Sequence, residues 1–83
     1  MATLLFQEEP TVAPSAGAIQ GFKVAWKSGT SAYFVSVYRW KDAQGGVETF
    51  FQECPTLTDV TNYLTTFSIP VSTRLRNLLS NRG

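Results

Sequence analysis

An alternation of apolar and polar residues with a period of two begins at Ile19 and continues almost to Cys54. Such alternation is typical of strands that bury one face. Short runs of glycine and polar residues interrupt it at 28–30 and at 42–46, and these residues favour turns. The pattern therefore predicts three antiparallel strands in succession, over residues 19–27, 31–40 and 47–53.

Two amphipathic helices are predicted after the last strand. Pro55 ends that strand, and Thr56 with Asp59 forms a capping-box pattern in which Asp replaces the usual Glu or Gln. Ser72 caps the second helix. Apolar residues recur in each helix at helical spacing, which predicts one buried stripe per helix: Leu57, Val60, Tyr63, Leu64 and Phe67 in the first, and Leu75, Leu78 and Leu79 in the second.

The first 17 residues are interpreted as an N-terminal arm or edge strand followed by a linker. The stretch from Glu8 to Gly17 holds two prolines and little that can be buried, whereas Thr3–Gln7 can add a short strand. Residues 18–83 then form a single domain of three strands and two helices. The expected fold class is α+β, a three- to four-stranded antiparallel meander with two C-terminal helices packed on one face.

Parity assigns the strand residues to the two faces of the sheet. If a two-residue turn closes the first hairpin, the inner face carries Phe22, Val24, Trp26, Tyr33, Val35, Val37, Val47 and Phe51. The outer face then carries an aromatic strip with basic and polar neighbours: Lys23, Lys27, Phe34, Ser36, Tyr38, Trp40, Glu48, Phe50 and Gln52. A slip of one residue would turn these aromatic side chains inward, so both registers remain open at this point.

Composition narrows the possible chemistry. A chain of 83 residues with 43% hydrophobic and 16% charged residues fits one small globular domain. Histidine is absent, which removes the commonest general base and metal ligand, so we expect no histidine-dependent triad and no zinc site. The single cysteine, Cys54, has no partner for an intramolecular disulfide, which favours a reducing compartment and a packing role for this residue.

We expect no catalytic activity, no cofactor and no metal. Glu48 and Glu53 have opposite parity on one strand, and Glu8 and Glu9 lie in the N-terminal arm, so no carboxylate pair is positioned for acid–base work. The apolar run Leu4–Phe6 is short and follows no basic region. We therefore expect neither a signal peptide nor a membrane span, and a cytoplasmic protein.

The outer strip is the leading candidate for recognition. A monomer of this size seldom leaves a large apolar face bare, so a protein partner, a homodimer mate or the N-terminal arm should cover it. Aromatic residues anchor protein interfaces, and a net charge of +1 provides no field that attracts nucleic acid. The expected partner-binding residues are Phe34, Tyr38, Trp40, Lys23 and Arg39, the last at the sheet end, where its side chain can reach either face.

Nucleic acid is the alternative partner, because aromatic residues beside lysines can stack on unpaired bases. The C-terminal stretch TLTDVTNYLTTFSIPVSTRLRNLLSNRG is also similar to the helix-turn-helix core of winged-helix DNA-binding proteins. In that family a capped helix leads through a turn, here longer and without glycine, to a second helix that begins Ser-Thr and ends Arg-Gly. The resemblance implies that Ser72, Thr73, Arg74 and Asn77 read the groove, with Arg76 and Arg82 available for phosphate.

In layout alone, a meander followed by two helices resembles small phage proteins that inhibit CRISPR effector complexes. Such inhibitors occupy a surface, which requires shape and a few anchoring residues but no catalytic group. The sequence therefore predicts a non-catalytic binding module of viral or bacterial type, a protein-binding regulator or inhibitor that uses the aromatic sheet face and the C-terminal helix. A small nucleic-acid-binding protein is the alternative.

Overall fold

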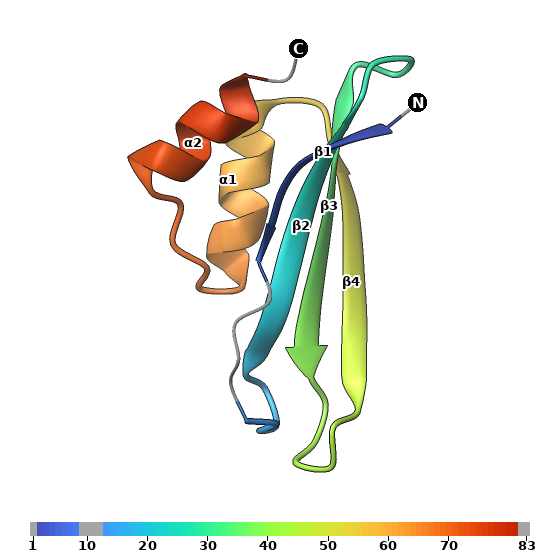
Figure 1. Ribbon diagram of the computed structural model, residues 1–83, viewed down its shortest axis with the longest axis vertical. Helices are drawn as coiled ribbons and strands as arrows, with labels where there is room; N and C mark the ends of the chain where they lie inside the picture. Colours follow the sequence, from blue (N-terminus) through green and yellow to red (C-terminus); the bar gives the residue numbers. More distant parts are fainter. Residues whose placement is uncertain (1, 9–12, 82–83) are drawn as a thin grey trace.

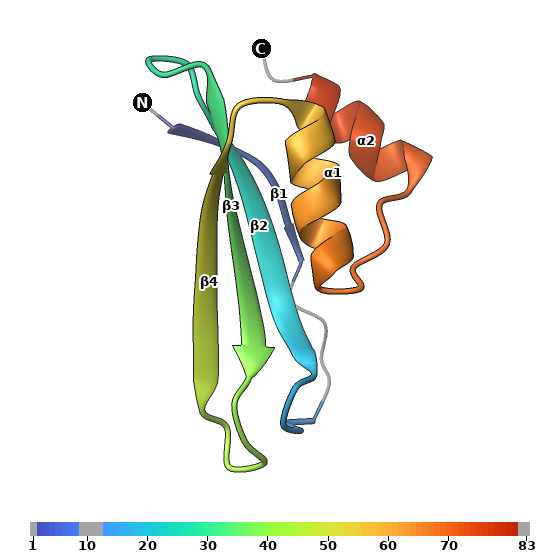
Figure 2. The ribbon, with the colours of Figure 1, turned by 180° about the vertical axis from the view of Figure 1, so that it is seen from behind.

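Four antiparallel strands form one open sheet in sequence order, and two helices follow (Figure 1). The computed structural model describes residues 2–8 and 13–81. Both helices lie on the same side of the sheet, and no described helix or strand lies on the other side (Figure 2). The predicted α+β meander is confirmed, with these elements: β1 (Ala2–Glu8), β2 (Ile19–Lys27), β3 (Ala32–Trp40), β4 (Val47–Cys54), α1 (Leu57–Thr66) and α2 (Thr73–Ser80).

The edge strand that the sequence allowed over Thr3–Gln7 is present as β1. It pairs antiparallel with β2, and the register shifts at a bulge between Leu4 and Phe6. This strand raises the number of strands to four. Residues 9–12 of the expected linker, and Arg82 at the C-terminal end, lie outside the described residues.

The first hairpin has the predicted register. Trp26 lies opposite Tyr33, as a two-residue turn would require, although the last pair is Lys27 with Ala32 and the connection is therefore longer. The side chains of β2 and β3 consequently take the predicted faces. Phe22, Val24, Tyr33, Val35 and Val37 are buried beneath the helices.

The predicted faces of β4 are wrong. Val37 lies opposite Phe50 and Trp40 opposite Val47, which is one residue away from the expected register. Because side chains alternate along a strand, this shift exchanges the faces of the whole strand. Glu48, Phe50 and Gln52 therefore lie on the helix side of the sheet, and Val47 and Phe51 lie on the outer side.

A tertiary contact explains this register. The Phe50 ring lies 5.2 Å from that of Phe67 at the end of α1, and the Arg39 guanidinium lies 4.7 Å from the Phe50 ring centroid. Each parity of β4 offers one phenylalanine and one smaller apolar residue, Phe51 with Val47 or Phe50 with Cys54, so local alternation alone does not select between the two registers. Contact with α1 favours Phe50 on the helix side.

Both predicted helix caps are confirmed. The Thr56 hydroxyl oxygen accepts from the Asp59 backbone N–H at 3.2 Å and donates to the Asp59 carboxylate at 2.9 Å. The Ser72 hydroxyl oxygen accepts from the Leu75 backbone N–H at 3.1 Å. The bonds from the Asp59 and Leu75 backbone N–H groups pair donors that the first turn of each helix leaves without an intrahelical partner.

The buried stripes of the two helices differ from the prediction at one position. Val60 and Leu64 of α1, and Leu75 and Leu79 of α2, are buried as expected. Leu78 is 41% exposed. Since Leu75 and Leu79 are four residues apart, they share the face that α2 turns to the sheet, and Leu78 is displaced toward one flank of the helix.

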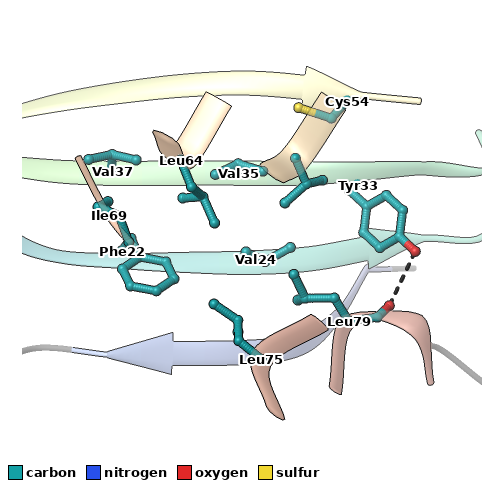
Figure 3. Close-up of a cluster of buried hydrophobic side chains, with 11 residues drawn as sticks. Phe22, Val24, Tyr33, Val35, Val37, Cys54, Leu64, Ile69, Leu75 and Leu79 are labelled. Carbon is teal, nitrogen blue, oxygen red and sulfur yellow. Dashed lines mark hydrogen bonds between the residues drawn. The ribbon is translucent and has the colours of Figure 1, made fainter. Parts of the chain in front are cut away.

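The core fills the space between the sheet and the helices (Figure 3). Tyr33 is fully buried within it, and its hydroxyl donates to the Leu79 carbonyl at 3.2 Å. This bond satisfies a buried phenol and also a carbonyl in the last turn of α2. The buried hydrophobic cluster comprises Phe22, Val24, Tyr33, Val35, Val37, Cys54, Val60, Leu64, Ile69, Leu75 and Leu79.

Adjacent leucines in α2 provide a matched test of this packing. We expect Leu79→Ala and Leu64→Ala each to lower the unfolding free energy by about 2–5 kcal/mol, because each leaves a cavity in the core. Leu78→Ala should cost less, roughly 1 kcal/mol, since its side chain is 41% exposed and lies outside the buried cluster. Urea unfolding followed by circular dichroism measures all three. Equal losses for Leu78→Ala and Leu79→Ala would contradict the orientation of α2.

Candidate functional site

The side of the sheet without helices is the main candidate site, and we call it the open face. It is formed by alternate residues of all four strands. The register of the sheet places these side chains on it: Leu4, Lys23, Ala25, Lys27, Phe34, Ser36, Tyr38, Trp40, Val47, Thr49, Phe51 and Glu53.

Exposed apolar side chains concentrate on the open face. Phe51 is 60% exposed, Leu4 55% and Val47 43%. Among the described residues, Leu78 is the only other large hydrophobic residue that is exposed. The rings of Phe34 and Phe51 meet edge to face, with centroids 5.5 Å apart. This pair forms a continuous aromatic surface across β3 and β4.

Two lysines on β2 border the aromatic pair. The Lys27 ammonium lies 5.5 Å from the Phe34 ring centroid, within cation–π range. Lys23 lies opposite Ser36, which is only 7% exposed and lies opposite Phe51 on its other side. The open face therefore has two lysines on β2, an interior strand, and aromatic side chains beside them on β3 and on the edge strand β4.

Tyr38 and Trp40 extend the open face toward the end of the sheet, where the strands reach beyond the helices (Figure 1). Both side chains are half-buried. The backbone of Trp40 is held by the segment that precedes β2, since its N–H donates to the Ala18 carbonyl at 2.8 Å and its carbonyl accepts from the Gly17 N–H at 2.9 Å. The indole nitrogen of Trp40 is buried without a hydrogen-bond partner among the described residues.

The structure brings four of the five predicted partner-binding residues together. Phe34, Tyr38, Trp40 and Lys23 share the open face. Arg39 lies on the opposite, helix side, where its guanidinium donates to one carboxylate oxygen of Glu48 at 2.8 and 3.2 Å. Arg39 is thus paired at the helix-side border of the sheet.

Sequence reasoning missed Phe51, Val47 and Leu4 as members of the open face. For the first two, the useful signal was the loop between β3 and β4. There the Asp42 carboxylate accepts from the Gln44 and Gly46 backbone N–H groups at 2.9 and 3.1 Å. An aspartate that binds backbone donors two and four residues ahead defines a six-residue connection, 41–46, and hence the observed pairing of β4.

The residues proposed for nucleic-acid contact are dispersed on the helix side. Ser72 is engaged in capping, and Thr73 and Asn77 are exposed on α2. Arg74 borders a cleft shared with β1, whereas Arg76 borders Leu57, Thr58 and Thr61 of α1. The structure therefore does not join these residues to the lysines of the open face.

A second feature is a groove of about 370 Å³ between β4 and α1, which we call the β4–α1 groove. Cys54 lies at its floor and is buried. Burial, and then the negative charge of Asp59, raise the pKa of the Cys54 thiol. Burial and Cys54 raise the pKa of Tyr63 in the same way. The groove is lined by Gln52, Glu53, Cys54, Pro55, Asp59, Asn62, Tyr63 and Thr66.

Within residues 2–8 and 13–81, no group of three or more Cys, Asp or Glu side chains is arranged to hold a metal ion. In the same part of the chain, neither helix has the length and apolar character needed to cross a membrane. Comparison with protein-family models, curated proteins and solved structures found no match to this chain.

The raised pKa of Cys54 predicts a pH dependence of stability. The unfolded thiol ionises near its ordinary pKa of about 8.5, whereas the folded thiol retains its proton to higher pH. The thiol's contribution to the unfolding free energy is therefore fully present below about pH 8.5 and is lost as pH rises toward the pKa of the folded state. We expect the unfolding free energy of the wild type to fall more steeply between about pH 8 and 10 than that of Cys54→Ala. Urea unfolding at several pH values measures this difference. Equal slopes of unfolding free energy against pH for the wild type and Cys54→Ala would contradict the prediction.

Proposed function

We propose that this chain is a non-catalytic protein-binding module, a regulator or inhibitor that acts by occupying a partner's surface through the open face. The observation that carries the proposal is the apolar strip along β3 and β4 on the sheet side without helices, where Phe51 contacts Phe34, Val47 lies opposite Trp40, and both Phe51 and Val47 are exposed. Small monomers rarely expose contiguous apolar patches of this kind unless they bind something.

The size of the open face suits a protein partner. Four strands about 4.8 Å apart, with about eight residues each at about 3.3 Å, span roughly 500 Å² of flat sheet. Accessible surface exceeds flat area because side chains project from it. A standard protein interface buries about 800 Å² of accessible surface per partner. The open face can therefore supply most of one side of such an interface.

The charges around the open face specify the chemistry of the partner. Lys23 and Lys27 project from the interior strand β2, beside Phe34 on β3 and Phe51 on β4. A complementary surface has an apolar region against the aromatic residues and carboxylates that face the lysines. In such interfaces the buried aromatic residues supply most of the affinity, whereas complementary charges mainly affect the association rate and partner choice.

Binding of single-stranded nucleic acid remains the alternative, since Lys27 above Phe34 matches a base-stacking site with a phosphate contact. Two features favour protein. Glu53 lies on the same face as the two lysines, and the arginines of α2 lie on the helix side of the sheet. Nucleic-acid affinity depends on many aligned cations, which this face does not gather.

The proposed action requires occupancy alone, as for the phage inhibitors that the layout resembles. One cysteine without a disulfide partner suits a reducing cytoplasm, and we place the protein there. No reaction is assigned to the chain.

Comparative capture tests the proposal. Immobilised wild type, Phe51→Ser, Trp40→Ala and the control Leu78→Ser are exposed to lysate of cells that carry the gene, and retained proteins are quantified by mass spectrometry. We expect a defined partner on the wild type and Leu78→Ser that is lost from the two face variants, because removing an interface aromatic costs about 2 kcal/mol or more, roughly a thirtyfold loss of affinity. Melting temperatures should stay within a few degrees.

Titration with labelled single-stranded DNA and RNA at two salt concentrations distinguishes nucleic-acid binding from protein binding. Binding that weakens steeply with salt and is lost in Phe51→Ser would establish nucleic acid as the ligand. Equal capture of the same partner by Phe51→Ser and wild type would overturn the role of the open face. If Trp40→Ala unfolds, that indole belongs to the core and only Phe51→Ser reports on binding.

A further inference from the structure

β4 is an edge strand whose protection is limited to negative charge. It pairs with β3 over eight consecutive residues without a register shift, contains neither proline nor lysine, and carries Glu48 toward the helix side and Glu53 toward the open face. The opposite edge, β1, has a bulge between Leu4 and Phe6 and packs against α2. Natural proteins use bulges, prolines, charged side chains or covering elements to prevent unwanted strand pairing. Carboxylates oppose pairing with an acidic strand but not with a basic one, so β4 can accept a strand that carries cationic side chains.

The β4–α1 groove runs beside this edge. An added strand would lie about 4.8 Å from β4 and would point alternate side chains to the helix side of the sheet. There the wall of the groove is formed by α1 through Asp59, Asn62, Tyr63 and Thr66. The combination of an open edge and a helix-lined groove is the geometry of peptide recognition by strand addition, in which the edge provides backbone hydrogen bonds and the groove selects side chains.

The charges at this edge select a basic segment. Asp59 is exposed on the α1 wall, and Glu53 lies on the edge strand itself with its side chain toward the open face. The lining of the groove includes no Lys or Arg. Arg39 is paired with Glu48 toward the other end of the strand. Negative charge therefore predominates where an added strand would pass Asp59.

We propose that the edge of β4 is a strand-addition site for an extended, basic segment of a partner protein. The segment pairs its backbone with Val47–Cys54 and directs a lysine or arginine into the β4–α1 groove toward Asp59. Its neighbouring residues face the opposite way and contact the Phe51 and Glu53 side of the edge. The proposal is independent of occupancy of the open face, because a strand can add to β4 whether that face is covered or free.

A basic segment fits this site better than a second copy of the chain. A second β4 brings Glu48 and Glu53 and no cationic residue, since the strand reads VETFFQEC. Pairing two such strands adds negative charge beside Asp59 and leaves the groove without a counterion. Complementary charge is available only from a different segment.

Peptide selection tests the proposal. A phage-displayed library of random ten-residue peptides is selected on the full-length protein, and the enriched sequences are synthesised and titrated by fluorescence anisotropy. We expect enriched peptides to carry Lys or Arg at alternate positions, and their binding to slow hydrogen exchange of the β4 backbone amides. Asp59→Asn should weaken binding by about two- to fivefold, the range for one exposed ion pair.

Matched variants separate charge from folding. Asp59→Glu keeps both the charge and the capping-box pattern and should bind as wild type. Glu8→Gln removes one negative charge on β1, at the opposite edge of the sheet, and should leave the Kd within about twofold. Four outcomes would overturn the proposal: no enriched peptide, enrichment without basic residues, equal Kd for wild type and Asp59→Asn, or β4 amides unprotected in the complex. A dimer in sedimentation that protects β4 without peptide would assign the edge to a second copy.

Discussion

The alternation of side chains along β3 determines which residues fold this protein and which face outward. Tyr33, Val35 and Val37 point to the helices and are fully buried. Phe34 and Ser36 point to the open face. Because β3 is paired on both sides, its pleat sets the parity of β2 and β4 as well. A slip of one residue in this strand would exchange core and surface across the whole sheet.

Both described helices lie on one face of the sheet, which leaves the other face open. Helices of ten and eight residues follow the sheet, and both are needed on the same side to bury its inner residues. The hydroxyl of Tyr33 then joins the sheet to the last turn of α2 through the Leu79 carbonyl. No described element remains to cover the other side, so the open face is a direct consequence of building a four-stranded sheet with a single helix layer.

Local signals predicted most of the fold. The meander, both caps and the register of β2 with β3 depend on turns and on residues within four positions of each other, such as Thr56 with Asp59. The faces of β4 depend on a contact between Phe50 and Phe67, which are 17 positions apart, and on a loop organised by Asp42. Alternation carries no information on such contacts.

The predicted residues of the candidate site were right where the strand faces were predicted correctly, on β2 and β3, and wrong where they were not, on β4. Phe34, Tyr38, Trp40 and Lys23 were placed together because the first hairpin was right. Phe51 was assigned to the core because the second hairpin was shifted by one residue, although it is the most exposed large hydrophobic side chain among the described residues. Arg39 was expected to reach either face because it lies at the sheet end and has a long side chain; with Glu48 on the helix side, the two side chains meet there.

β4 separates two surfaces that differ in chemistry. Its outward side chains, Val47 and Phe51, belong to the open face, which is apolar along β3 and β4 and basic along β2, whereas its backbone edge adjoins a groove lined by Glu53 and Asp59. Under the two proposals above, a partner that binds both surfaces must present an apolar patch with carboxylates and a separate basic segment, and each requirement excludes surfaces that satisfy only the other. Two surfaces of opposed charge therefore limit the range of partners more than either surface alone.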